Sequence, residues 1–164
     1  PSGSFTVATW INPQTIASGR NTRILDRSGV FSLQFNANGY LQFQVEGLTP
    51  GNVVGPQLPL NQWNLVMAAY DFDNQQMRLY VNGELVTAAS VTGTIAINTN
   101  PLYFGSSNAN EKFKGRLDEV RFYNRILTSN ELNGLYNTAT ATPVSTNTPT
   151  NTPTKTPTTK KMPK

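Results

Sequence analysis

Carboxylates are the first side chains in this sequence to consider for chemistry, and Asp118 is the most unusual of them. Val120 and Phe122 follow it at alternate positions, so in a β-strand the three side chains would share one face. A carboxylate among apolar side chains needs hydrogen bonds, a cation or a metal ion. We therefore interpret Asp118 either as a metal ligand or as a carboxylate satisfied by Arg125 or by backbone amides.

A second group of oxygen ligands comes from Asp71, Asp73 and Asn74, which lie within four residues of one another. Such a group suits a hard cation such as Ca²⁺. Asp and Asn are also ordinary turn residues that hydrogen-bond to their own backbone. The twelve-residue calcium loop that ends in glutamate is absent, so we favour the turn.

Aromatic side chains are the candidates for stacking against a sugar. Trp10 and Trp63 both fall within expected strands, which favours a place in the core over a place in a binding site. Tyr40, Tyr103 and the polar loop 106–110 are expected to be more exposed.

Arginine and asparagine side chains near these exposed segments could hydrogen-bond to sugar hydroxyls, or could be ordinary polar surface. The candidate ligand-binding residues are Tyr40, Tyr103, Asn108 and Arg27.

These side chains would be positioned by short strands separated by turn residues, the pattern of an all-β sandwich. Residues 77–87 form two alternating runs around Asn82-Gly83, which predicts a hairpin with a two-residue type I′ turn. Residues 30–35 and 40–45 flank residues 36–39 as a second hairpin. The long apolar run 63–72 predicts a central strand buried on both faces.

One helix is expected after the last strand. Thr128 and Glu131 have the spacing of a capping box. Leu132, Leu135 and Tyr136 then share one helical face. Gly134 limits the expected helix to two or three turns.

The chain divides by composition into residues 1–137 and a Thr/Pro-rich tail, 138–164. Regular prolines exclude a helix or central strand, so the tail is expected to be extended. Thr/Pro runs are typical sites of O-glycans in extracellular proteins. The expected glycosylation sites are Thr148, Thr150, Thr152, Thr154, Thr156 and Thr158.

Charge and hydropathy exclude two kinds of partner. The net charge of +4 comes entirely from four lysines of the tail, Lys155, Lys160, Lys161 and Lys164. The body is neutral, which argues against nucleic-acid binding. No apolar run approaches the ~20 residues that span a bilayer, so no membrane insertion is expected.

The order of several motifs resembles a laminin-G-like domain of the concanavalin A-like lectin/glucanase superfamily. The motifs are FTVATWINP (5–13), NQWNLV (61–66), MRLYVNG (77–83), LYFG (102–105) and GRLDEVRFYNRIL (115–127). The resemblance implies a jelly-roll sandwich of two antiparallel sheets, followed here by one short C-terminal helix and an extended tail. It also implies a mostly non-catalytic domain that binds glycans, cell surfaces or matrix proteins, often with calcium, for which Asp118 would be the ligand.

Catalysis has little support in the residues. The chain has neither histidine nor cysteine, which removes Ser-His and Cys-His nucleophilic pairs, thiolate metal sites and disulfides. Glycosidases of the superfamily usually place two acids two residues apart on one strand. Asp71 and Asp73 have this spacing on an expected turn, whereas Asp118 and Glu119 are adjacent and would point to opposite faces. We predict that the protein is not an enzyme.

Family members usually carry an upstream strand for which this sequence has no counterpart, so the sandwich is expected to lack its first strand. A missing strand would leave unpaired backbone at a sheet edge. Upstream residues, the alternating segment 138–142, or a strand from another subunit could fill the gap.

Two main functions are therefore predicted, beside a third in which the chain is an accessory domain detached from a secreted hydrolase. The first is an extracellular or cell-surface binding and adhesion module for glycans or surface proteins, on an O-glycosylated stalk. The alternative is a structural subunit of an extracellular filament or surface layer, polymerised by donor-strand complementation between copies of itself.

Overall fold

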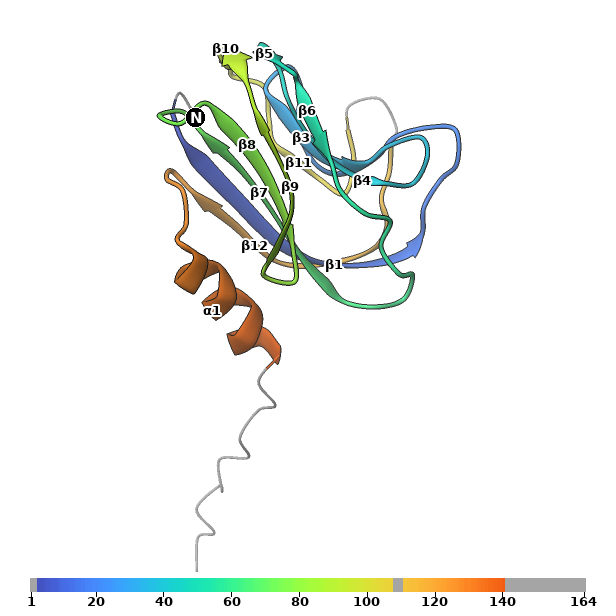
Figure 1. Ribbon diagram of the computed structural model, residues 1–164. Coiled ribbons are helices and arrows are strands. Elements are labelled where there is room, and N and C mark those ends of the chain that lie inside the picture. Colours follow the sequence, from blue (N-terminus) through green and yellow to red (C-terminus); the bar gives the residue numbers. More distant parts are fainter. Residues whose placement is uncertain (1–2, 108–110, 141–164) are drawn as a thin grey trace, which may run out of the picture.

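The computed structural model describes residues 3–107 and 111–140 and confirms the predicted all-β sandwich (Figure 1). Both large sheets are antiparallel. Sheet I contains, in spatial order, β12 (Lys114–Tyr123), β1 (Phe5–Thr15), β7 (Asn64–Asp71), β8 (Gln76–Val81) and β9 (Glu84–Ser90). Sheet II contains β11 (Tyr103–Phe104), β2 (Thr22–Arg27), β3 (Phe31–Phe35), β4 (Leu41–Val45) and β6 (Asn52–Val54). The short strands β5 (Leu48–Thr49) and β10 (Thr92–Gly93) pair separately.

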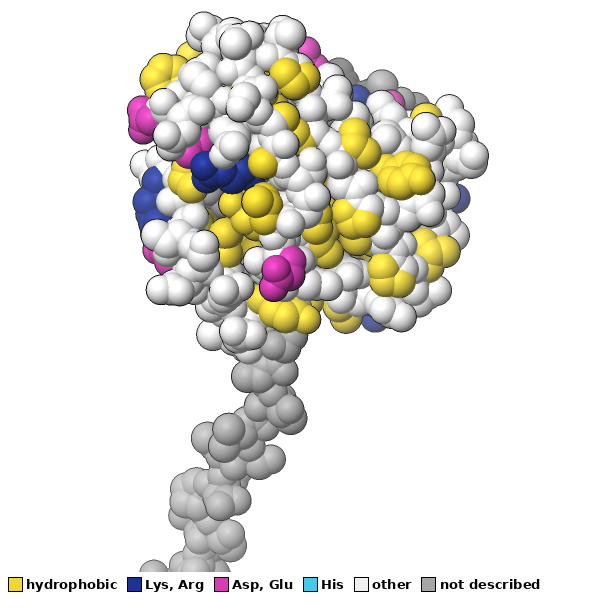
Figure 2. Space-filling model, viewed as in Figure 1, with side chains coloured by type: hydrophobic (Ala, Val, Ile, Leu, Met, Phe, Trp, Pro, Cys, Tyr) yellow, Lys and Arg dark blue, Asp and Glu magenta, His cyan; other side chains and the backbone are white. Residues whose placement is uncertain are grey.

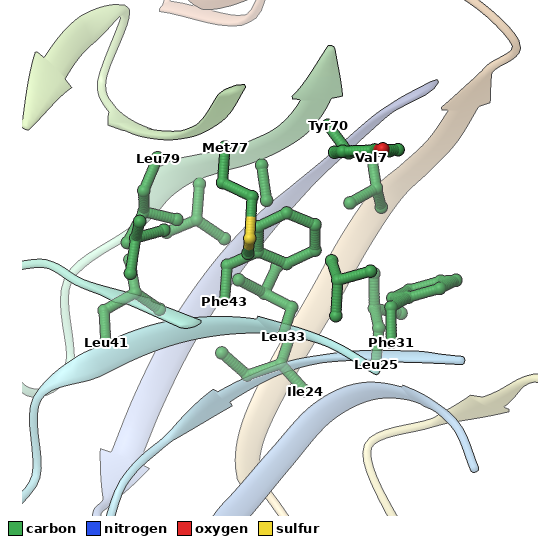
Figure 3. Close-up of a cluster of buried hydrophobic side chains, with 14 of the residues drawn as sticks. Val7, Ile24, Leu25, Phe31, Leu33, Leu41, Phe43, Tyr70, Met77 and Leu79 are labelled. Carbon is green, nitrogen blue, oxygen red and sulfur yellow. The ribbon is translucent and has the colours of Figure 1, made fainter. Parts of the chain in front are cut away.

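The main core lies between the two sheets, and alternation along each strand supplies its side chains. In β4, Leu41, Phe43 and Val45 are buried while Gln42 and Gln44 are only partly buried. Figure 3 shows side chains of both sheets meeting in this core. The labelled ones are Val7, Ile24, Leu25, Phe31, Leu33, Leu41, Phe43, Tyr70, Met77 and Leu79.

Strand β7 is buried along its whole length and lies in the middle of sheet I, as the apolar run predicted. Its second face is covered by helix α1 (Ser129–Thr140), which packs on the side of sheet I away from sheet II (Figure 1). This packing forms a second, smaller core. Its buried members are Ala8, Trp10, Leu65, Met67, Leu127 and Leu132.

Both central residues of the predicted type I′ turn have positive φ, Asn82 at 53° and Gly83 at 88°. The Asn82 Oδ1 accepts a 2.9 Å hydrogen bond from the Leu65 amide, which ties the turn to the start of β7. A Cβ at Gly83 would lie 2.9 Å from the side-chain oxygen of Asn133 in α1. Glycine is therefore favoured here by the positive φ of the backbone, and a side chain would also displace the Asn133 amide.

The capping box predicted for α1 is present. The Glu131 amide donates to the Thr128 Oγ1 at 3.4 Å, and the Thr128 amide donates to Glu131 Oε2 at 2.8 Å. Arg125 adds two hydrogen bonds to the Glu131 carboxylate, at 2.6 and 2.9 Å. Residues 138–140 belong to α1, so the expected added strand over 138–142 is wrong for these three residues.

These contacts predict a pH dependence of stability. Hydrogen bonds from Arg125, then from the amide and hydroxyl of Thr128, lower the pKa of Glu131 from 4.5 to about 2. The carboxylate therefore stabilises the fold fully above about pH 4.5, and this contribution is lost as the pH falls towards 2. We expect the difference in thermal midpoint between wild type and Glu131→Gln to shrink steadily over that interval. A difference that stays constant from pH 5 to 2 would contradict the prediction.

Strands β6 and β9 approach each other on the side of the sandwich seen in Figure 2, where hydrophobic side chains gather. Gly55 allows the approach, because a Cβ there would lie 2.9 Å from Leu79 Cδ2 and 3.3 Å from Val86 Cγ2. Val54 in β6 and Leu85 and Val86 in β9 remain exposed. Apolar side chains of both strands therefore form part of the molecular surface where the two sheets approach each other.

Candidate functional site

The candidate site is an open pocket of about 660 Å³ on the face of sheet I that also carries α1. Its volume lies within the range of about 300–1,000 Å³ that is usual for small-molecule sites. Strands β1 and β12, the residue before β7, and α1 supply its walls. The lining residues are Trp10, Trp63, Asp118, Glu119, Arg121, Tyr136 and Thr138.

The two tryptophans of the chain reach this pocket by alternation. Trp10 of β1 pairs with Leu65 of β7, and Trp63 lies two positions before Leu65, on the same face. Trp10 is buried, as predicted, and stacks on Tyr136 with ring centroids 5.9 Å apart and an interplanar angle of 18°.

Trp63 is 42% exposed, so the prediction that it lies in the core is wrong. The reason is its position: β7 begins at Asn64, so Trp63 stands at the entrance of the strand. It offers an aromatic face beside a buried aromatic pair, an arrangement suited to stacking against a sugar ring.

The Trp10 side chain, which contributes to the pocket lining, also carries an unsatisfied donor in its buried part. Its indole Nε1–H is buried and has no hydrogen-bond acceptor within the described part of the chain. Leaving such a group unpaired costs about 1–3 kcal/mol.

A β-bulge in β12 positions the charged residues of the pocket. Ala8 pairs with Arg121 and Trp10 with Asp118, so Glu119 and Val120 stand opposite Thr9 alone. Glu119 has φ of 52°, a left-handed conformation that costs a non-glycine residue of order 1–3 kcal/mol. Such strain is often stored at functional sites.

The bulge also corrects the predicted surroundings of Asp118. Leu117 and Val120 both pack against the main core, although they are three positions apart. Phe122 contacts Phe31 of the main core, with ring centroids 6.0 Å apart. Asp118 instead faces the pocket, so the expectation that it shares a face with Val120 and Phe122 is wrong, because it assumed an unbroken alternation.

Local contacts satisfy part of the charge in the pocket. Asp118 Oδ1 accepts a 2.8 Å hydrogen bond from the Glu119 amide, which confirms the backbone-amide alternative. Arg125, the other expected partner, is bonded to Glu131 instead. Glu119 forms an ion pair with Arg121. Among the described residues Asp118 has no ion-pair partner of its own.

The side chains around Asp118 offer few ligands for a metal ion. Within residues 3–107 and 111–140, no group of three or more acidic, His or Cys side chains is placed to hold a metal ion. Asp118 is exposed and no longer needs a cation to offset burial. Calcium at Asp118 stays a prediction.

Asp71, Asp73 and Asn74 form a turn, which is the alternative that the sequence favoured over a cation site. Asn74 donates to both carboxylate oxygens of Asp71, from its amide at 3.1 Å and its side chain at 2.9 Å. Arg78 lies 3.3 Å from the same carboxylate. Burial raises the pKa of Asp71, but the hydrogen bonds from Asn74 and the charge of Arg78 outweigh it, so the pKa is lowered.

The predicted ligand-binding residues lie away from the pocket, and the structure does not bring them together. Tyr40 is exposed beside the turn before β4. At the opposite end of sheet II, Tyr103 pairs with Asp26, beside Arg27. The Arg27 guanidinium donates to the carbonyl oxygens of Asn98 at 2.6 Å and Asn100 at 3.2 Å. Asn108 and the tail threonines, Thr148, Thr150, Thr152, Thr154, Thr156 and Thr158, lie outside the described residues.

A smaller hollow of about 200 Å³ on sheet II includes Arg27 in its lining. Arg23 lies between two carboxylates there, 2.7 Å from Glu111 and 3.6 Å from Asp26. The pKa of Asp26 is raised, mainly by burial. The charge of Arg23 lowers this pKa, and the charge of Glu111 raises it. These groups mainly satisfy one another, so the hollow is a weaker candidate than the aromatic pocket.

The pocket residues that sequence reasoning missed are Trp63, Glu119, Arg121 and Tyr136. Trp63 alternates with Leu65 and Met67, and this pattern indicated that Trp63 lies on the same face of the sheet as these two residues.

No helix in the described part of the chain is long and apolar enough to cross a membrane.

Comparisons with known proteins agree with this fold. A search of solved structures finds a putative carbohydrate binding protein from Bacteroides ovatus, 25% identical with a TM-score of 0.69, over 80% of this chain but only 40% of that one. It also finds the CBM40 domain of Ruminococcus gnavus IT-sialidase bound to α2,3 sialyllactose, 16% identical, with a TM-score of 0.66 and coverage of 82% of both chains. The binding domain of Paraclostridial Mosquitocidal Protein 1 is 18% identical over 84% of this chain and 37% of its own, with a TM-score of 0.66.

The similarities to the CBM40 domain and to the mosquitocidal-protein domain concern the fold alone. No curated protein matches the chain. A laminin-G family model, described as concanavalin A-like lectin/glucanases superfamily, matches residues 1–133. The chain therefore belongs to the concanavalin A-like lectin/glucanase superfamily.

Proposed function

We propose that this protein is a non-catalytic carbohydrate-binding module that acts outside the cell. The observation that carries the proposal is the pocket in which the exposed face of Trp63 adjoins the stacked pair Trp10–Tyr136, with Asp118 and Arg121 beside it. Aromatic faces with a few polar groups are the usual composition of a small-ligand site. The Bacteroides ovatus structure, described as a putative carbohydrate binding protein, supports the same function.

The arrangement of the acids supports binding rather than hydrolysis. Glu119 is engaged by Arg121, and Asp118 is its immediate neighbour in the chain. Glycoside hydrolysis needs one carboxylic acid on each side of the scissile bond.

We propose further that the Thr/Pro-rich tail carries O-glycans and serves as a stalk for the domain. An intact mass that exceeds the sequence mass by hexose-sized steps would support this proposal, and an unshifted mass would contradict it.

The experiment on the pocket compares two aromatic residues of equal exposure. Trp63 and Tyr40 are each 42% exposed, but only Trp63 lines the pocket. On a glycan array followed by calorimetry, Trp63→Ala is expected to weaken binding by roughly 30-fold or more, the loss of about 2 kcal/mol typical of a buried aromatic anchor. Tyr40→Ala is expected to leave affinity unchanged. The reverse result would place the site at the turn before β4, and binding to no glycan would exclude the function.

A second candidate function, self-assembly into a filament or surface layer, is favoured by one observation. Strand β12 spans ten residues at the edge of sheet I, and among the described residues no strand pairs with its outer side. Such an edge can accept a strand from another copy. A single monomeric species in light scattering on the native protein would exclude this function.

A further inference from the structure

We infer that the aromatic pocket selects uncharged sugars and rejects sugars that carry a carboxylate. This inference rests on the proposed function and specifies the class of ligand that the pocket takes. The selection depends on the net charge of the pocket after the ion pairs within the protein have cancelled.

Three charged side chains line the pocket, Asp118, Glu119 and Arg121. Glu119 and Arg121 form an ion pair with each other, so their charges largely cancel. Asp118 has a hydrogen bond from the Glu119 amide but no cationic partner in the described part of the chain. The pocket therefore presents one uncompensated negative charge to a ligand.

The position of Asp118 makes that charge relevant to a stacked sugar. Asp118 is the direct cross-strand partner of Trp10, and side chains of such pairs are neighbours on one face of the sheet. A sugar ring lying on Trp63 within this pocket would turn its hydroxyl edge towards the polar wall. Hydroxyl groups can donate to the Asp118 carboxylate, whereas a carboxylate on the ligand would face a like charge.

The hydrogen-bonding capacity of the Asp118 carboxylate fits the same class of ligand. A neutral hydroxyl can donate a hydrogen bond to the Asp118 carboxylate while accepting one from another donor, because it has both capacities. A carboxylate has no proton to donate at neutral pH and could not form that hydrogen bond.

The shared fold does not predict the same ligand as the CBM40 domain, which is bound to sialyllactose, an anionic sugar. In this chain the one arginine of the pocket, Arg121, is already engaged by Glu119. Acidic sugars would need that guanidinium, because Arg is the usual partner of a ligand carboxylate.

The test uses pairs of glycans on one core, neutral and acidic, on the full chain. The array carries N-acetyllactosamine with its 3′- and 6′-sialylated forms, and neutral gluco-oligosaccharides with their terminal-uronate counterparts. We expect the neutral member of the best-bound pair to bind at least about tenfold more tightly than its acidic form, because juxtaposed like charges disfavour binding.

Two variants report on the cause. Asp118→Asn keeps an oxygen for the Glu119 amide but removes the charge, and is expected to narrow the tenfold preference to less than about threefold. Glu119→Gln releases Arg121 and is expected to strengthen binding of the acidic form. Thermal midpoints close to wild type would show that both variants fold.

The outcomes separate the inference from the proposed function. Equal or tighter binding of the acidic glycans by wild type would overturn the inference and leave a carbohydrate-binding module. A preference for neutral glycans that survives in Asp118→Asn would also overturn it, because the charge would not be its cause. Binding to no glycan at all would overturn both.

Discussion

Replacing Trp10 with alanine is expected to lower the free energy of unfolding by about 3–5 kcal/mol, the range for truncating a buried large aromatic side chain. Trp10 is only 8% exposed and belongs to the second core, where Leu127 and Leu132 attach α1 to sheet I. The substitution removes the ring on which Tyr136 stacks. The helix is therefore expected to lose much of its attachment.

Urea unfolding followed by circular dichroism measures this effect, and the second tryptophan provides the control. Trp63→Ala removes the same type of side chain from an exposed position, and surface changes usually stay within about 0.5 kcal/mol. A double-mutant cycle with Tyr136→Ala should give a coupling of about 0.5–1.5 kcal/mol for the stacked pair. If Trp10→Ala cost less than 1 kcal/mol, the helix would not depend on this contact.

Replacing Phe43 with alanine is expected to cost a similar amount, about 3–5 kcal/mol, but in the main core. Phe43 has no exposed surface and contacts Phe5 at a ring-centroid distance of 6.1 Å. Because Phe43 lies in sheet II and Phe5 in sheet I, the cavity would open between the sheets. The whole sandwich should therefore lose stability together.

A phenylalanine of the same sheet supplies the comparison for Phe43. Phe104 in β11 is 54% exposed, and Phe104→Ala is expected to change the unfolding free energy by no more than about 0.5 kcal/mol. The denaturant midpoint should fall for Phe43→Ala without a change in the slope of the transition. Equal losses in the two variants would mean that Phe43 does not connect the sheets.

Much of the fold could be predicted because its signals are local. Asn82-Gly83 set the hairpin turn, the alternation of Leu41 and Phe43 set the inner face of β4, and Thr128 with Glu131 set the start of the helix. In each case a few adjacent residues decide the backbone, and the structure confirms them. The likeness of the motifs to the superfamily is confirmed as well.

The candidate site was harder to predict because long-range packing decides it. Strict alternation placed Asp118 with Val120, but Leu117 and Val120 both pack against the core, and only a bulge lets both do so. Two apolar residues three positions apart in a strand were the one local sign of the extra residue. The exposure of Trp63 depends on where β7 begins and on how far α1 covers the sheet, and no local pattern specifies either.

The β12 bulge also bears on how such a site could diversify. Because the bulge absorbs one residue, the two halves of the strand keep their inward and outward positions on either side of Glu119. A gene losing that single codon would encode a regular strand with Leu117 and Val120 still inward and Asp118 and Arg121 still outward. Insertion or deletion at position 119 could thus change the side chains that line the pocket while the residues that pack in the core keep their places.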